Sequence, residues 1–143
     1  MSCISKASMS EVDLDLLDKV CADAGMELVR NQKTYRWYGT YIGGPLPEGF
    51  TTADLGKCEH AIRVKGADKH VHEVGVCNRN GKTNFLWDDW QKGFGLMDKI
   101  GADCRNIIQG YRNREFKANA KHMGLALVKE EVTAQGQLVL HFR

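Results

Sequence analysis

The dipeptide Asn80-Gly81 constrains the fold more than any other feature of the sequence. Asn and Gly both tolerate positive φ angles, so this pair between two apolar runs is the strongest short-range signal for a β-hairpin turn. The runs on either side cover residues 71–77 and 83–87, and a third strand-like run covers residues 60–65. Because such short turns join antiparallel strands, the three runs predict an antiparallel meander.

Helical periodicity lies on both sides of this meander. Apolar residues recur at three- and four-residue spacing from residue 12 to residue 24, and again from residue 97 to residue 111 with a possible continuation to residue 123. This spacing indicates two amphipathic helices. Residues 10–13 match the capping-box pattern for the start of the first helix, and Gly25 follows its end. The expected core residues of the two helices are Leu16, Leu17, Val20, Ile100, Ile107 and Ile108.

Further strand-like runs complete the predicted fold. They cover residues 3–9, 26–30 and 32–41, and a closing hairpin covers residues 125–132 and 137–142. This order predicts an α+β fold, an antiparallel sheet with two main helices packed on one face. The chain has 143 residues and no linker-like segment, so we expect a single domain over residues 1–143.

Charge and cysteine usage argue against several classes of protein. The chain carries 20 Lys and Arg against 18 Asp and Glu, a net charge of +2, which is too small for a general binder of the phosphate backbone. Five cysteines without C-x-x-C spacing fit reduced thiols rather than a disulfide framework. The first residues lack the apolar core of a signal peptide, and no apolar run approaches the roughly 18 residues of a membrane span. We therefore expect a cytoplasmic protein.

Aromatic residues cluster around residues 35–41 and 87–90, beside glycine-rich loops. Rings with polar edges next to such loops are typical of the mouth of a ligand pocket, and the Arg36 guanidinium suits a phosphate or carboxylate. In the alternative interpretation, some of these aromatic residues fill the core and the others cover its rim. The predicted ligand-binding residues are Arg36, Trp37, Tyr38, Tyr41, Lys57, His60, Trp87 and Trp90.

Patterns for metal binding and catalysis are weaker. The side chains of metal-ligand type are Cys58, His60, His70, His72 and Cys77. Their spacing matches no standard zinc pattern, so we assign no metal. No phosphate-binding loop, dinucleotide fingerprint or nucleophile elbow is present, so we assign no cofactor and no catalytic residue.

Three carboxylates remain as an alternative. Asp88 and Asp89, with Glu73, are of the type that serves acid–base chemistry or holds magnesium. We expect instead that one aspartate of the adjacent pair caps the following segment and that the other is solvated.

A basic stretch in the second predicted helix supports a different function. Its cations are Arg105, Arg112, Arg114, Lys117 and Lys121, with Glu115 as the single acidic residue among them. One helix face with several cations can bind nucleic acid. The stretch also fits an ordinary solvated helix face, because cations near a helix C-terminus are favourable.

Several segments together carry a resemblance to a known family. They are Trp37-Tyr38-Gly39, Pro45-Leu46-Pro47-Glu48-Gly49-Phe50, Asp54-Leu55-Gly56-Lys57-Cys58-Glu59-His60-Ala61-Ile62, Leu86-Trp87-Asp88-Asp89-Trp90 and the hairpin between Gly124 and Gly136. Over nearly the whole chain, these segments resemble the uncharacterised family of hypothetical chloroplast reading frame thirty-five, and most closely its phage-type members. The resemblance implies a small intracellular accessory protein, encoded by a phage, with a compact α+β fold. The family pattern includes Cys58 and His60 but not His70 and His72, which argues against a metal site built from all four.

These observations favour a non-enzymatic binding module for a small ligand, such as a nucleotide-like signal that is sequestered, or for a host protein. Nucleic-acid binding through residues 105–121 is the alternative. We further expect residues 37–60, which contain both prolines, to form an ordered excursion that covers an edge or face of the sheet. Arg36, Tyr38, Tyr41, Lys57 and His60 would lie at the rim of a cleft or at a contact between subunits of a homo-oligomer.

Overall fold

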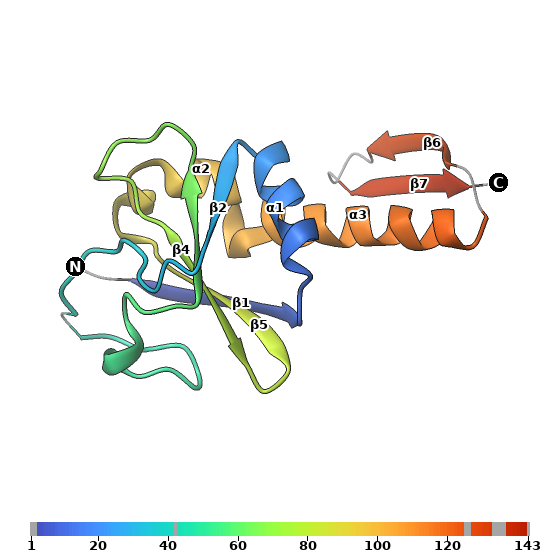
Figure 1. Ribbon diagram of the computed structural model, residues 1–143. Helices are drawn as coiled ribbons and strands as arrows, with labels where there is room; N and C mark the ends of the chain where they lie inside the picture. The colour runs from blue at the N-terminus through green and yellow to red at the C-terminus, as the bar shows by residue number, and fades with distance from the viewer. Residues whose placement is uncertain (1–2, 42, 125–126, 133–136, 143) are drawn as a thin grey trace.

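A computed structural model (Figure 1) describes residues 3–41, 43–124, 127–132 and 137–142. Five strands form the main sheet: β1 (Ile4–Ser10), β2 (Met26–Arg30), β3 (His60–Val64), β4 (Val74–Arg79) and β5 (Lys82–Asp88). Three helices are α1 (Leu14–Asp23), α2 (Leu96–Ile100) and α3 (Arg105–His122), and a separate hairpin pairs β6 (Leu127–Val132) with β7 (Leu138–Phe142). The α+β class is therefore confirmed.

The five strands pair antiparallel throughout, in the order β1-β5-β4-β3-β2. The meander is confirmed, because β3, β4 and β5 are neighbours along the sheet. Arg79 pairs with Lys82, so Asn80 and Gly81 form the two-residue turn, with φ angles of 53° and 73°. Positive φ at both turn residues is the geometry that matches the twist of the two strands.

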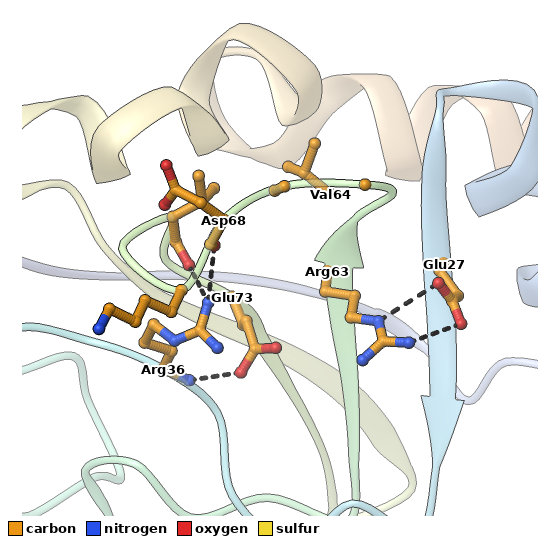
Figure 2. A pocket seen from close by; sticks show the side chains of 10 residues that line it. Glu27, Arg36, Arg63, Val64, Asp68 and Glu73 are labelled. Carbon is orange, nitrogen blue, oxygen red and sulfur yellow. Dashed lines mark hydrogen bonds and ion pairs between the residues drawn. The ribbon is translucent and has the colours of Figure 1, made fainter.

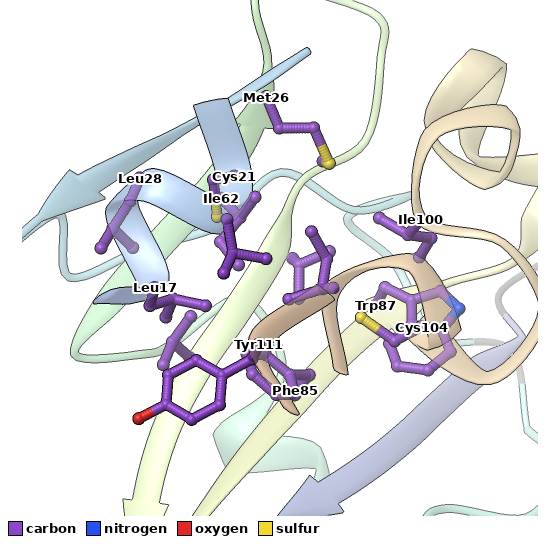
Figure 3. Packing of buried hydrophobic residues seen from close by; sticks show 14 of the residues in the cluster. Leu17, Cys21, Met26, Leu28, Ile62, Phe85, Trp87, Ile100, Cys104 and Tyr111 are labelled. Carbon is purple, nitrogen blue, oxygen red and sulfur yellow. The ribbon is translucent and has the colours of Figure 1, made fainter. Parts of the chain in front are cut away.

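The helices cover one face of the sheet and form the main core (Figure 3). Leu17, Val20, Ile100 and Ile107 are buried as expected, whereas Leu16 and Ile108 are only half-buried at its edge. The helix α1 begins one turn later than the capping-box pattern predicts. Its N-cap is Asp13, whose carboxylate accepts a hydrogen bond from the Leu16 N–H.

The opposite face of the sheet is covered by the long segment between β2 and β3, which confirms the predicted excursion. Tyr35 and Phe50 of this segment pack on Ala61, Cys77 and Leu86 and form a second, smaller core. The segment is ordered by a few backbone contacts, among them an isolated bridge between residues 34 and 57 and a single 3₁₀ turn at Thr52–Asp54. It is not the strand that the aromatic residues at 32–41 predict.

Glycine makes this cover possible at one position in β4. A Cβ at Gly75 would lie 2.4 Å from the ring of Tyr35, so only glycine lets the ring lie directly on the strand. The aromatic residue therefore packs against the sheet instead of pairing within it. This is the physical reason that a sequence with high strand propensity forms a loop here.

Two other predicted elements differ from the structure. The strand predicted from residue 71 begins only at Val74. The single long helix predicted from residue 97 is broken into α2 and α3, because Gly101, Asp103 and Cys104 all have positive φ. Among the described residues, no helix is long and apolar enough to cross a membrane.

Candidate ligand-binding site

The end of β5 fixes three segments of the chain around one buried carboxylate. Asp88 is fully buried, and its Oδ1 accepts hydrogen bonds from the backbone N–H of Cys3 (2.9 Å) and Trp90 (3.0 Å). Its Oδ2 accepts from the N–H of Tyr38 at 3.0 Å. Asp88 thus caps the following segment, as expected of one member of the pair. Asp89 is not merely solvated, since it accepts hydrogen bonds from Ser5 and from the indole of Trp87.

The segment before Tyr38 is attached to the residue that precedes β4. The N–H of Arg36 donates to Glu73 Oε1 at 2.8 Å, and the N–H of Glu73 donates to the carbonyl of Arg36 at 2.9 Å. The guanidinium of Arg36 then reaches the β3–β4 loop, where Nη1 donates to the carbonyls of Val71 (2.9 Å) and Asp68 (3.3 Å). Arg36 is held in place by the backbone, and no described residue hydrogen-bonds its Nε or Nη2.

An unusual backbone turn presents a third aromatic residue. Gln91, Lys92, Gly93 and Phe94 are consecutively left-handed, with φ between 51° and 66°. Each non-glycine residue in this conformation costs roughly 1–2 kcal/mol, and such strain is often found at functional sites. The N–H of His72 donates to the carbonyl of Gly93 at 2.9 Å, which ties the turn to the β3–β4 loop. Phe94 remains 47% exposed, edge-on to His72 with ring centroids 5.2 Å apart.

Residues 36–38, the β3–β4 loop and the left-handed turn together line a cavity of about 480 Å³, which we call the aromatic pocket. Its lining residues are Arg36, Trp37, Tyr38, Lys69, His70, His72 and Phe94. Tyr38 is 44% exposed and contacts Trp90 edge-to-face at a centroid distance of 6.3 Å. The lining combines aromatic rings with cationic side chains and contains no carboxylate. An aromatic ring can stack there, and an anionic group attached to it would meet the cations.

A second cavity has a volume of about 410 Å³, and Figure 2 shows the residues that line it. We call it the polar pocket, and it shares Arg36 and Lys69 with the aromatic pocket. Its remaining charged residues are Glu27, Arg63, Asp68 and Glu73. Arg63 forms a two-pronged ion pair with Glu27, at 2.9 Å and 3.2 Å, and this pair lowers the pKa of the Glu27 carboxyl.

The structure brings together some of the predicted ligand-binding residues and separates others. Arg36, Trp37 and Tyr38 line the aromatic pocket, and Trp90 lies against Tyr38. The prediction for Trp87 is wrong. Side chains alternate along a strand, so Trp87 points to the helix face, where it is 1% exposed, while Asp88 points to the other face.

The three remaining predicted residues do not line the aromatic pocket. Tyr41 donates a hydrogen bond to the carbonyl of Gly44 within its own loop, and Lys57 is exposed near the bridge to Thr34. His60 lies in β3, where its Nδ1 accepts from the N–H of Asn31 at 2.9 Å and burial lowers its pKa.

Four lining residues were not predicted as ligand contacts, namely Lys69, His70, His72 and Phe94. The two histidines appeared in the sequence only as possible metal ligands. His72 is buried, and its Nδ1 lies 3.0 Å from the carbonyl oxygen of Asp88, an acceptor, so Nδ1 carries the proton. The glycines on either side of Phe94 are the only sequence signal for the turn that exposes it.

The predicted metal-type side chains do not come together as one set of ligands, and the two cysteines lie in the second core. The Cys58 thiol donates to the carbonyl of Gln32, and the Cys77 thiol donates to that of Lys57. Burial raises the pKa of Cys58 to about 12 and that of Cys77 to about 11. Within the described ranges, no three His, Cys, Asp or Glu side chains are grouped as a metal ion would require.

The basic residues of α3 do not share one face. At about 100° per residue, Arg105 and Arg112 lie on one side of the helix and Arg114, Lys117 and Lys121 on the opposite side. Arg114 forms an ion pair with Asp23 of α1. The helix therefore offers no single stripe of five cations.

The chain matches no protein-family model, no curated protein and no solved structure. The family resemblance accordingly depends on the sequence segments that carry it.

Proposed function

We propose that the protein is a non-enzymatic binding module that captures a small nucleotide-like ligand in the aromatic pocket. The observation that carries this proposal is the composition of the lining, which combines aromatic rings with the cations Arg36 and Lys69 and contains no carboxylate side chain. A nucleotide presents the complementary pair, a flat base for the rings and a phosphate for the cations.

The geometry supports binding without large rearrangement. Arg36 is fixed by two backbone carbonyls and by the pairing of its backbone with Glu73, and Tyr38 is fixed through Asp88. A ligand group that meets side chains already held in place loses less conformational entropy on binding. As a phage-type accessory protein, the module would act by sequestering a nucleotide signal of the host.

Titration calorimetry with AMP, GMP, CMP and UMP tests the proposal. We expect at least one of them to bind, and we expect Tyr38→Ala to weaken binding by about 5-fold to 160-fold, because stacking of a base on an aromatic ring contributes about 1–3 kcal/mol. Lys69→Ala should weaken the binding of nucleotides more than that of the corresponding nucleosides, because nucleosides lack the phosphate.

Tyr41→Ala and Lys57→Ala are matched controls of the same residue types outside the pocket. Both should bind like the wild type. Absence of binding for all four nucleotides, or equal losses in the pocket and control variants, would overturn the proposal.

A further inference from the structure

The polar pocket contains a buried carboxylate, Glu73, of which only one oxygen accepts hydrogen bonds from described residues. Glu73 is 6% exposed, and its Oε1 accepts hydrogen bonds from the Arg36 N–H (2.8 Å) and from Gln32 Nε2 (3.2 Å). No described residue donates a hydrogen bond to its other oxygen, Oε2. Figure 2 shows the carboxylate between the side chains of Arg36 and Arg63 on the wall of the cavity. Since Oε2 is not among the fully buried polar atoms that lack a partner, it is accessible from the cavity, and an accessible charged acceptor favours a ligand that brings an N–H group.

The charge of the polar pocket restricts what else can enter it. The cations Arg36, Arg63 and Lys69 face an equal number of carboxylates from Glu27, Asp68 and Glu73. A terminal polyphosphate would meet all three carboxylates and be repelled by them. A neutral group with an amino donor fits the same lining without this repulsion.

The two pockets meet at Arg36 and Lys69, which line both. A group between the pockets would therefore lie beside two cations, and the guanidinium of Arg36 keeps its Nε and Nη2 free of hydrogen bonds within the described part of the chain. One phosphate suits this position, because a guanidinium donates to phosphate oxygens in a fixed geometry.

We propose that the two pockets are halves of one site, and that the ligand is a dinucleotide whose phosphodiester lies at Arg36 and Lys69. One base stacks in the aromatic pocket. The exocyclic amino group of the second base donates to Glu73 Oε2 in the polar pocket. This inference extends the proposed function, since it identifies the class of nucleotide that the same site selects.

Calorimetric titration with the 3′,5′-linked dinucleotide ApA and with AMP tests the inference. We expect ApA to bind at least about tenfold more tightly than AMP. The corresponding dinucleotide of unsubstituted purine, which lacks both amino groups, should lose most of this gain, because its stacking and charge are the same but it has no donor for Glu73.

Glu73→Gln isolates the second half of the site. Its amide oxygen can still accept from the Arg36 N–H, so the fold is kept, while the charged acceptor in the polar pocket is lost. We expect this variant to bind ApA about 5-fold or more weakly than the wild type does, and to bind AMP with unchanged affinity. Glu115→Gln is the control, because Glu115 is an exposed carboxylate of α3 that lines neither pocket, and this variant should bind both ligands like the wild type.

The outcomes separate the two proposals. If AMP and ApA bind equally, or if Glu73→Gln weakens both by the same factor, the dinucleotide inference is wrong and the proposed function stands. If neither ligand nor any mononucleotide binds, both are wrong.

Discussion

The Oδ2 atom of Asp88 lies 3.0 Å from the backbone nitrogen of Tyr38, and the resulting hydrogen bond attaches the binding segment to the end of β5. The partner oxygen of the same carboxylate holds the N–H groups of Cys3 and Trp90. One buried side chain therefore fixes the backbone of both Tyr38, whose ring lines the aromatic pocket, and Trp90, whose ring contacts it. Stability and binding are coupled at this residue.

Asp88→Asn should separate these contacts. An amide has one acceptor oxygen, which we expect to remain with the N–H groups of Cys3 and Trp90, so the amide NH₂ then faces the Tyr38 N–H. A buried donor left unpaired costs about 1–3 kcal/mol, and we expect this loss in urea denaturation, together with weaker nucleotide binding. Asp98→Asn, at an exposed carboxylate of α2, should change stability by less than about 0.5 kcal/mol. Unchanged stability and affinity in the Asp88 variant would contradict the role given to its carboxylate.

The left-handed turn at residues 91–94 predicts a substitution that stabilises the protein. Gln91 is exposed and has φ 51°, so Gln91→Gly removes the cost of a side chain in that conformation. After the entropic cost of glycine is subtracted, we expect a gain of about 0.5–1 kcal/mol in the free energy of unfolding.

Gly93→Ala serves as the comparison for this turn. It adds a Cβ at φ 66° that would lie 2.7 Å from the Cβ of Leu96, and it should destabilise the protein clearly. Urea denaturation of both variants checks the pair. A loss of stability in Gln91→Gly would show that the turn is not left-handed at this position.

The thiols should differ in reactivity according to their burial. Cys3 is exposed, whereas Cys21, Cys77 and Cys104 are buried and Cys58 is half-buried. Burial raises the pKa of Cys21 to about 12 and holds that of Cys104 well above its usual range. We expect iodoacetamide at pH 8 to modify Cys3 rapidly in the folded protein, and all five thiols only after denaturation, as read by intact-mass spectrometry.

The same thiols predict alkaline destabilisation. In the folded protein the pKa of the Cys58 thiol is about 12, above its ordinary value of 9.0. The folded state therefore binds the thiol proton more tightly than the unfolded state does. Stability is therefore fully present below pH 9 and decreases as the pH rises toward 12. In Cys58→Ser the decrease should be smaller, and thermal unfolding at pH 8 and pH 10.5 measures the difference. An identical decrease in both proteins would exclude Cys58 as a contributor.

The sequence predicts the sheet well where local chemistry and tertiary packing agree. Asn80-Gly81 forms its turn because positive φ is required at both residues, and Gly25 follows α1 for the same reason. The prediction is wrong at residues 32–41, since the packing of Tyr35 on Gly75 depends on a strand 40 residues away. Residues 85–87 are all apolar, so the sequence does not indicate which of them faces the helices, and it wrongly predicts Trp87 as a ligand-binding residue.

Half of the site could not be read from the sequence for a related reason. Arg36, Trp37 and Tyr38 are adjacent in the chain, so one aromatic cluster in the sequence predicts all three. Phe94 reaches the same pocket through a run of left-handed residues. Hydrophobic periodicity does not predict that conformation. Lys69 lies in an unremarkable turn, and only the hydrogen bonds from Arg36 to that turn bring it to the pocket.

The arrangement of α3 leads to the last prediction, which concerns nucleic acid. Each neutralised phosphate contributes about −0.9 to the slope of log K against log salt for duplex DNA. One face of α3 presents two of the five cations and the opposite face three, among them Arg114, which pairs with Asp23. Binding of duplex DNA should therefore be weak and its slope no steeper than about −3. Arg105→Ala combined with Arg112→Ala should leave nucleotide affinity unchanged, because neither residue lines the aromatic or the polar pocket. Fluorescence anisotropy with a labelled duplex at several salt concentrations measures the slope, and a value near −4.5, as expected for five cations acting together, would instead support the helix as a nucleic-acid interface.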